Sequence, residues 1–331
     1  MSEAYRDAGV DTEAAAEAVA LIGELAGRAR RPEVADEVGG FAGLFRIGQG
    51  RLLAAATDGV GTKLEIARTT GRLDTVGIDL VAMCADDVVC TGAEPLFFLD
   101  YLAVGRVVPE RVASIVQGVA EGCRRAGCAL LGGETAEHPG VMPPDQFDLA
   151  GFCVGSVAES DLLGAHRVRE GDALIGLPSS GLHANGYSLV RAALLDRFGL
   201  DEQVEALGRT LGDELLEPCT IHAPDVLRLH RDGLLRAAAH ITGGGFSENV
   251  PRALPAGFGA RIERGTWREH PIFGLIQHES GASDEAMFST FNMGLGMVLV
   301  VAPEHARAVT GGADGAVRVG TVVPGAAIEI V

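Results

Sequence analysis

Lysine is almost absent from this chain of 331 residues, because 26 of its 27 basic side chains are arginines and Lys63 is the single exception. Asparagine is nearly as scarce and occurs only at Asn185, Asn249 and Asn292. All four residues lie in or beside glycine-rich segments. Lysine offers a compact point charge where arginine offers a wide planar fork. The placement of Lys63 therefore indicates chemistry that arginine could not supply, with chance placement as the alternative.

Other absences exclude whole classes of protein. With a net charge of −18, the chain has no excess of basic residues for a nucleic-acid surface. No apolar run approaches the roughly 18 residues of a membrane span, and the first residues do not form a secretory signal. We therefore expect a cytoplasmic protein without nucleic-acid or membrane partners. The six cysteines contain no CxxC pair, which favours buried thiols over disulfides or zinc.

The length and the order of the expected elements indicate a mixed α/β fold in two domains. In the first half we expect helices at residues 12–28, 76–91 and 111–126 and strands at residues 51–57, 96–104, 128–131 and 147–157. The theme of strand, glycine loop and helix returns in the second half. A polar patch near residues 159–172 reads as the connection between the halves. The predicted domains are residues 1–165 and 170–331.

The first candidate site is the loop that follows the expected strand at residues 51–57. Asp58, Gly59, Gly61, Thr62 and Lys63 occur there together. Two glycines let the backbone approach an anion, and the other side chains suit phosphate, metal and base roles. The spacing is not that of a Walker A loop. A tight turn carrying a surface lysine is the alternative.

The second candidate is an acidic edge on the expected helix at residues 76–91. Asp79, Asp86 and Asp87 lie seven and eight residues apart, so a helix brings them to one side. Asp100 interrupts an apolar strand, where a carboxylate needs a partner or a site. This pattern resembles a magnesium site, which uses one or two carboxylates plus substrate phosphates. A solvated helix face is the alternative.

Three further loops are weaker candidates when each is taken alone. Gly132, Gly133, Glu134 and Thr135 follow a short strand, the position at which α/β proteins place ligands. A second loop carries Ser180, His183 and Asn185 just before a helix, so that its histidine could move a proton or donate to a substrate oxygen. The third loop, Gly243 to Gly245, could cradle an anion. Ordinary turns, or a helix cap at His183, are the alternatives.

Taken in order, these motifs resemble the phosphoribosylformylglycinamidine cyclo-ligase family, also called aminoimidazole ribonucleotide synthetases. The similar stretches cover nearly the whole chain, and they are YRDAGVD, RRPEV, TDGVGTKL, GIDLVAMCADD, GAEPLFFLDY, GGETAEHPG, DLAGFCVG, SSGLHANGYSLVR, ITGGGFSENVPRALP and FNMGLGM.

The resemblance implies a reaction and a homodimer. In this family ATP, with Mg²⁺, phosphorylates the formyl amide oxygen of formylglycinamidine ribonucleotide. The amidine nitrogen then displaces phosphate and closes the imidazole ring, a step of purine biosynthesis. The N-terminal domain is expected to bind ATP and to form the dimer interface through its sheet, and the C-terminal domain to bind substrate.

The resemblance also assigns expected roles to individual residues. Metal ligands would be Asp58, Asp79, Asp87 and Glu134. The catalytic residues would be Lys63, His183 and Asn185. The ATP phosphates would contact Asp58, Gly59, Gly61, Thr62, Lys63, Gly132, Gly133 and Thr135. The substrate would contact Ser180, His183, Asn185, Gly243, Gly244 and Gly245.

Some positions depart from the family pattern, mostly in the second half. Asp86 replaces a common asparagine and His138 a common methionine, and residues 218–222 read PCTIH in place of PTRIY. Ala286 and Ser289 stand where glutamate and arginine are frequent. These departures leave two alternatives open. One is a diverged copy or a small-molecule kinase resembling thiamine-phosphate kinase or selenophosphate synthetase. The other is an inactive nucleotide-binding subunit.

Overall fold

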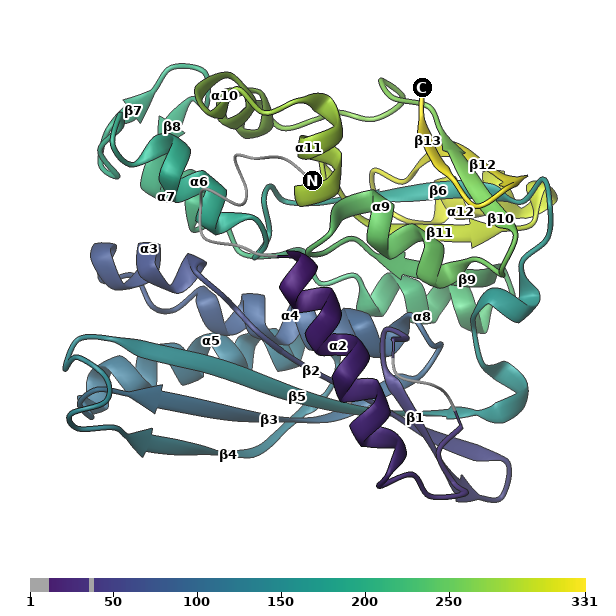
Figure 1. Cartoon of the computed structure of the whole chain (residues 1–331), viewed down its shortest axis with the longest axis horizontal. Coiled ribbons are helices and arrows are strands. Elements are labelled where there is room, and N and C mark those ends of the chain that lie inside the picture. The colour runs from purple at the N-terminus through teal and green to yellow at the C-terminus, as the bar shows by residue number, and fades with distance from the viewer. Residues whose placement is uncertain (1–11, 36–38) are drawn as a thin grey trace.

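The computed structural model describes residues 12–35 and 39–331, in which two β-sheets are separated by helices (Figure 1). The YRDAGVD motif and the rest of residues 1–11 lie outside the described residues. The mixed α/β fold predicted from the sequence is confirmed. The expected helix at residues 12–28 is α2 (Thr12–Gly27), which crosses the molecule in front of the first sheet in Figure 1.

The first sheet belongs to the N-terminal half and has the strand order β1-β2-β5-β3-β4. β3 and β4 are parallel and the other neighbours are antiparallel. Its strands are β1 (Gly43–Gly48), β2 (Arg51–Gly59), β3 (Glu94–Val104), β4 (Ala129–Glu137) and β5 (Phe147–Ala158). The helices α3 (Lys63–Thr70), α4 (Val76–Val89) and α5 (Pro109–Ala126) follow β2 and β3 in the chain.

Helix α4 lies between the first sheet and the C-terminal half, so it is apolar on almost every side. Thirteen of its residues are buried, and Asp87 is the exception. It crosses α5 at a very close contact, because a Cβ on Gly77 would lie 2.2 Å from the backbone nitrogen of Val119. Gly118 on α5 is equally restricted by the backbone of Asp74. The crossing therefore requires glycine on both helices.

Only one face of the first sheet is covered by these helices. Phe98 and Leu102 are buried on the face that packs on α4 and α5, whereas Tyr101 and Phe152 are 42% and 41% exposed on the other face. Side chains alternate between the two faces of a strand, so the sheet has one core face and one open face. Figure 1 shows α3, α4 and α5 above this sheet.

The second sheet belongs to the C-terminal half and has the order β13-β10-β12-β6-β11-β9. Its central strands β6 and β11 are buried nearly throughout. Its strands are β6 (Ala173–Pro178), β9 (Leu235–His240), β10 (Phe258–Ile262), β11 (Leu295–Val301), β12 (Val317–Pro324) and β13 (Ile328–Ile330). A separate two-stranded sheet pairs β7 (Gln203–Val204) with β8 (Arg209–Thr210).

Seven helices accompany the second sheet. They are α6 (Tyr187–Leu194), α7 (Leu211–Leu215), α8 (Ala223–Arg231), α9 (Gly245–Asn249), α10 (Pro271–Ser280), α11 (Asp284–Thr290) and α12 (Ala306–Gly312). The α8 helix packs against α4, which joins the two halves. The described helices include none that is long and apolar enough to cross a bilayer. All six cysteines are free and five are buried, as the sequence predicted.

Candidate active site

Lys63 lies at the first turn of α3 and is completely buried. Its Nζ is 2.8 Å from Asp79 Oδ2 on α4, and it donates to the carbonyl oxygens of His183 at 3.1 Å and Glu217 at 2.8 Å. Burial alone would lower the pKa of Lys63, but the charge of Asp79 outweighs it and the pKa is raised. The ammonium is therefore charged and fully occupied by protein oxygens.

This geometry corrects two expectations. Lys63 was expected at the ATP phosphates, and Asp79 at the metal. Asp79 is also fully buried, and its Oδ1 accepts from the backbone nitrogen of Cys219 at 2.8 Å. Both groups have partners within the protein, so neither faces a ligand. The sequence pattern showed correctly that these residues are unusual, but not that their charges satisfy each other.

A second acidic group gathers around the other end of α4. His240, the last residue of β9, has its Nδ1 2.9 Å from Asp87 Oδ1. Burial and the negative charge of Asp87 raise the pKa of Asp58, which the N–H of Gly59 and His240 partly offset. Burial of His240 is in turn outweighed by the hydrogen bond and charge of Asp87, which raise the pKa of His240. Asp58, Asp87 and His240 thus form one electrostatic group, here called the carboxylate pair with its histidine.

The carboxylate pair fits a magnesium ion shared with a phosphate. Burial is the main cause of the raised pKa of Asp58, and the negative charge of Asp87 on a different element adds to it, a repulsion that a divalent cation would relieve. The described residues contain no group of three or more acidic, histidine or cysteine side chains arranged as a complete metal cage. Magnesium does not need one, because it keeps several waters and takes few protein ligands beside substrate phosphates.

The register of the first sheet separates the remaining N-terminal residues. Asp58, Gly151, Asp100 and Gly133 are successive partners across four strands, so all four point to the core face. Glu134 pairs with Tyr101 one row further on, and it therefore points to the open face. Glu134 cannot join Asp58 and Asp87 within one chain, which corrects the predicted set of four metal ligands.

The strand β4 places its two glycines and Thr135 at the exposed edge of the first sheet. A Cβ on Gly133 would lie 2.4 Å from Asp100 Oδ1, so the glycine leaves room for that carboxylate. Three strand spacings separate Gly133 from Asp58, or about 14 Å. A single phosphate could not contact both, and the row between them is covered by Phe98 and by Leu80 of α4.

The loop before α6 is folded around His183, which is 2% exposed and has a left-handed φ of 61°. Its Nε2 accepts from the backbone nitrogens of Ser180 and Thr220, each at 3.3 Å. Burial and the positive charge of nearby histidines lower the pKa of His183 well below its usual range. His183 is thus a neutral structural centre, which corrects its expected catalytic role. Ser180 is also engaged, because its Oγ donates to the Pro218 carbonyl at 2.6 Å.

Asn185, two residues after His183 in the same loop, lies between α4 and Gly243. Its Nδ2 lies 3.8 Å from Met83 Sδ on α4, and its Oδ1 lies 3.4 Å from where a Cβ on Gly243 would be. The structure therefore places Asn185 beside Gly243, while their role as substrate contacts stays a prediction. Thr62 is also near, since its Oγ1 lies 3.3 Å from Ser188 Oγ at the start of α6.

The other two asparagines hold loops in place. Asn249 Nδ2 donates to the carbonyls of Gly243 and Gly245, and Asn292 Nδ2 donates to Gly181. Gly245 is required by packing, because a Cβ there would lie 2.0 Å from the Phe288 carbonyl oxygen. The scarcity of asparagine thus marks loop geometry at two of its three positions.

Sequence reasoning missed His240, His222 and the role of Asp86. Asp86 is fully buried and accepts from the backbone nitrogens of His222 at 3.0 Å and Ala223 at 2.8 Å, at the start of α8. Burial raises the pKa of Asp86 to about 6. Burial also lowers the pKa of His222 to about 3. The signal for His240 was its position directly before the Gly243 to Gly245 loop.

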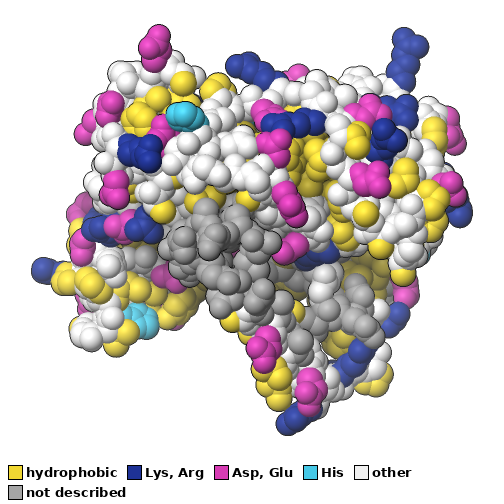
Figure 2. Space-filling model, turned by 45° about the horizontal axis from the view of Figure 1, so that its top comes forward, with side chains coloured by type: hydrophobic (Ala, Val, Ile, Leu, Met, Phe, Trp, Pro, Cys, Tyr) yellow, Lys and Arg dark blue, Asp and Glu magenta, His cyan; other side chains and the backbone are white. Residues whose placement is uncertain are grey.

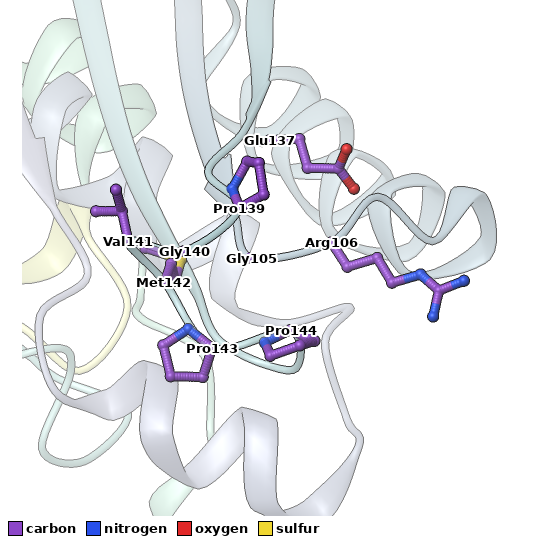
Figure 3. A pocket seen from close by; sticks show the side chains of 9 residues that line it. All are labelled: Gly105, Arg106, Glu137, Pro139, Gly140, Val141, Met142, Pro143 and Pro144. Atoms are coloured by element: carbon purple, nitrogen blue, oxygen red, sulfur yellow. The ribbon is translucent and has the colours of Figure 1, made fainter.

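The face drawn in Figure 2 carries acidic and basic side chains in a mixed arrangement. A hollow of about 650 Å³ lies between the loops at residues 105–106 and 137–144 (Figure 3). Its lining includes Arg106 and Glu137 but none of the residues predicted from the sequence. Glu137 is engaged there, because it accepts from the backbone nitrogen of Val107 at 2.7 Å.

Comparison with known proteins agrees with this architecture. The model for AIR synthase related protein, N-terminal domain, matches residues 39–157, and that for AIR synthase related protein, C-terminal domain, matches residues 169–331. A phosphoribosylformylglycinamidine cyclo-ligase from Shouchella clausii is 54% identical, with 91% of this chain and 89% of the relative covered. The chain belongs to the phosphoribosylformylglycinamidine cyclo-ligase family. A relative of the same name from Geobacillus kaustophilus is 51% identical, over 92% of this chain and 90% of that protein.

Solved structures at lower identity share the fold. A thiamine-monophosphate kinase from Stenotrophomonas maltophilia has a TM-score of 0.63 at 17% identity, covering 92% of both chains. A PurL from T. maritima, complexed with ADP, has a TM-score of 0.59 at 16% identity, over 90% of this chain and 44% of the other. Members of the cyclo-ligase family are ligases that form a carbon–nitrogen bond, whereas these two likenesses establish the fold alone.

Proposed function

We propose that this chain is an ATP-dependent cyclo-ligase that converts formylglycinamidine ribonucleotide to aminoimidazole ribonucleotide, with release of ADP and phosphate. The support is the identity to named cyclo-ligases over nine-tenths of the chain. The observation that carries the proposal is the carboxylate pair with its histidine. It connects Asp58, at the start of the proposed phosphate loop at residues 58–62, with His240, the last residue of β9 in the second sheet. ATP use is further supported by the ADP-bound PurL, which has the same fold.

The reaction makes a poor leaving group into a good one. Transfer of the γ-phosphoryl group to the formyl amide oxygen gives an iminophosphate, and attack by the amidine nitrogen then expels phosphate. Such chemistry depends mainly on positioning and on neutralising phosphate charge. Asp58 and Asp87 would hold Mg²⁺, which supplies that neutralisation when bound. The hydrogen bond from His240 fixes the orientation of the Asp87 carboxylate.

Backbone N–H groups are assigned to ATP, and the Asn185 amide with the neighbouring glycines is assigned to the ribonucleotide substrate. Gly59, Gly61 and Thr62 would offer N–H groups to the ATP phosphates, and Gly132, Gly133 and Thr135 on the exposed strand β4 would contact another part of the nucleotide. Asn185, with Gly243 and Gly244, would contact the ribonucleotide substrate. These assignments rest on the contact between Asn185 and Gly243 and on the shared core face of Asp58 and Gly133.

The open face of the first sheet supports a homodimer. Tyr101 and Phe152 remain exposed on it in the single chain, and large apolar residues on one sheet face favour burial against a partner. A second copy of the sheet packed on this face would cover Glu134, which then could act at the interface. Sedimentation at micromolar concentration should show a dimer, and a monomer with full activity would contradict this assignment.

The decisive experiment is turnover of formylglycinamidine ribonucleotide with ATP and Mg²⁺, followed by mass spectrometry. We expect aminoimidazole ribonucleotide, ADP and free phosphate in equal amounts. A product that retains the phosphoryl group would instead indicate a small-molecule kinase, for which the fold of the thiamine-monophosphate kinase is the supporting likeness. ATP binding without consumption would indicate an inactive subunit.

A further inference from the structure

Residues 217–222 form an irregular segment between α7 and α8, and this segment is held by buried charges of the N-terminal half. Lys63 Nζ donates to the Glu217 carbonyl, and Asp79 Oδ1 accepts from the Cys219 nitrogen. Two turns further along α4, Asp86 accepts from the nitrogens of His222 and Ala223. Lys63 on α3 and the two aspartates on α4 thus hold the backbone of this segment at both of its ends by hydrogen bonds.

The same ammonium also holds the loop before α6. Lys63 Nζ donates to the carbonyl of His183, whose ring accepts from the Thr220 nitrogen of the held segment. Ser180 adds a bond from its Oγ to the Pro218 carbonyl. The left-handed backbone of His183 is an uncommon conformation for a non-glycine residue, and it needs such support to persist.

We propose that Lys63, Asp79 and Asp86 form an interdomain clasp, and that Lys63 is a positioning residue which sets Asn185 against α4 and Gly243. Lys63 acts through the His183 loop and touches neither substrate. This inference rests on the proposed function only for the role of Asn185. The clasp itself follows from the burial and contacts of the three side chains.

The chemistry of the clasp explains the single lysine. Three oxygens, of Asp79, His183 and Glu217, surround Nζ from three different segments. An ammonium has three donors around one point, whereas a guanidinium presents its donors in one plane. A buried charge also resists rearrangement, because either partner left alone would be an unpaired ion in an apolar interior.

Wild-type protein supplies the first test, because Lys63 is the only lysine in the sequence. The native protein, prepared without a lysine-containing tag, is treated briefly with acetic anhydride, and acetylation of the Lys63 peptide and of the N-terminal amine is measured by mass spectrometry. We expect Lys63 to react at least a hundredfold more slowly than the N-terminus, with or without the ATP analogue AMPPCP and Mg²⁺. Labelling at a comparable rate, above all if AMPPCP protects, would overturn the clasp.

The second test compares Lys63→Met with wild type by hydrogen–deuterium exchange. We expect exchange at least tenfold faster in residues 179–186 and 217–223, and unchanged exchange in the central strands of the second sheet. Arg46→Met serves as the matched control, since Arg46 pairs with Glu159 at the surface. Unchanged exchange in the two segments would contradict the clasp. If Lys63→Met does not fold, the labelling test on wild type still decides.

Binding and kinetics separate positioning from direct contact. In Lys63→Met, the Kd for AMPPCP should stay within twofold of wild type, whereas kcat should fall and the KM for formylglycinamidine ribonucleotide should rise about tenfold. A tenfold weaker affinity for AMPPCP with unchanged exchange would place Lys63 at the phosphates. Labelling and exchange need no turnover, so a failed cyclo-ligase assay beside positive results there would count against the proposed function alone.

Discussion

Two aspartates on α4 have opposite environments although they lie only two turns apart. Asp79 is completely buried and forms an ion pair with Lys63. The side chain of Asp87 is 16% exposed and lies 2.9 Å from His240 of the second sheet. Both residues belong to the same strongly apolar helix, although Asp87 follows another aspartate and Asp79 lies between isoleucine and leucine. The difference shows that an acidic edge on a buried helix can be fully enclosed at one end and partly open to solvent at the other, which leaves only the open end accessible to a ligand.

The largest effect, on kcat/KM, is expected from replacing Asp87, the partly exposed aspartate of the two. Asp87→Asn should keep the fold but lower kcat/KM by about 10³-fold, or about 4 kcal/mol, because one carboxylate at the phosphates is lost. The measurement is steady-state turnover across a Mg²⁺ titration, in which half-saturation should also rise. Asp225→Asn on the surface of α8 is the matched control and should retain full activity. Equal activity of the two variants would remove Asp87 from the site.

Replacing Lys63, the partner of the buried Asp79, should lower the stability of the fold instead. Lys63→Met leaves Asp79 as an unpaired buried charge, which should lower the free energy of unfolding by about 3 kcal/mol. Urea unfolding at pH 7 measures this loss. Replacing both charges, as Lys63→Met with Asp79→Leu, should recover part of it. A loss below about 1 kcal/mol in the single variant would mean that the pair is not sealed as described.

A pH dependence of stability should come from His222, which packs near His183 between the two halves. Burial lowers the pKa of His222 to about 3 from 6.5, so below pH 6.5 the unfolded chain binds a proton that the folded chain does not. Its contribution to stability is complete above pH 6.5 and falls as the pH drops toward 3. At pH 5 the loss should be about 2 kcal/mol.

The variant His222→Gln isolates this contribution. Its unfolding free energy, measured in urea at pH 7 and pH 5, should fall less between the two than that of wild type, by about 2 kcal/mol. An equal fall in both proteins would show that another group carries the acid sensitivity.

The smallest effect is expected at an exposed ion pair. Arg46 and Glu159 lie 3.0 Å apart with nearly half of each side chain in solvent. Such pairs contribute little, because water screens the charges. Arg46→Ala should cost less than about 1 kcal/mol in urea unfolding. A larger loss would weaken the contrast between sealed and exposed pairs.

Much of the fold was predictable from local patterns. The apolar periodicity of α5 and the alternation in β5 predicted those elements within two residues of their ends. Strand β4 was predicted too short, as residues 128–131, because its second half is Gly132 to Glu137, a polar run with little strand propensity. Pairing with β3 forms that half, and such pairing is not visible in the segment itself.

The site was predictable in part for the same reason. Asp58 lies near Asp87, and Asn185 lies near Gly243, while the binding roles predicted for them stay predictions. Glu134 was misplaced because the face of a strand depends on register, and a bulge between Phe98 and Leu99 changes the parity along β4. Lys63 and His183 were misassigned because several of their partners are backbone carbonyls and nitrogens more than thirty residues away. No side-chain motif records such contacts.

The burial of α4 on every side has a consequence for engineering this enzyme. Thirteen of its residues touch one half of the molecule or the other, so the helix offers almost no neutral position for substitution. Repacking the core around α4 would change the orientation of Asp87. It would also change the hydrogen bonds from this helix to residues 217–222. Substitutions that aim at heat tolerance or turnover should therefore be made elsewhere, on the solvent side of helices such as α5 and α12. Changes there leave the packing of α4 unaltered.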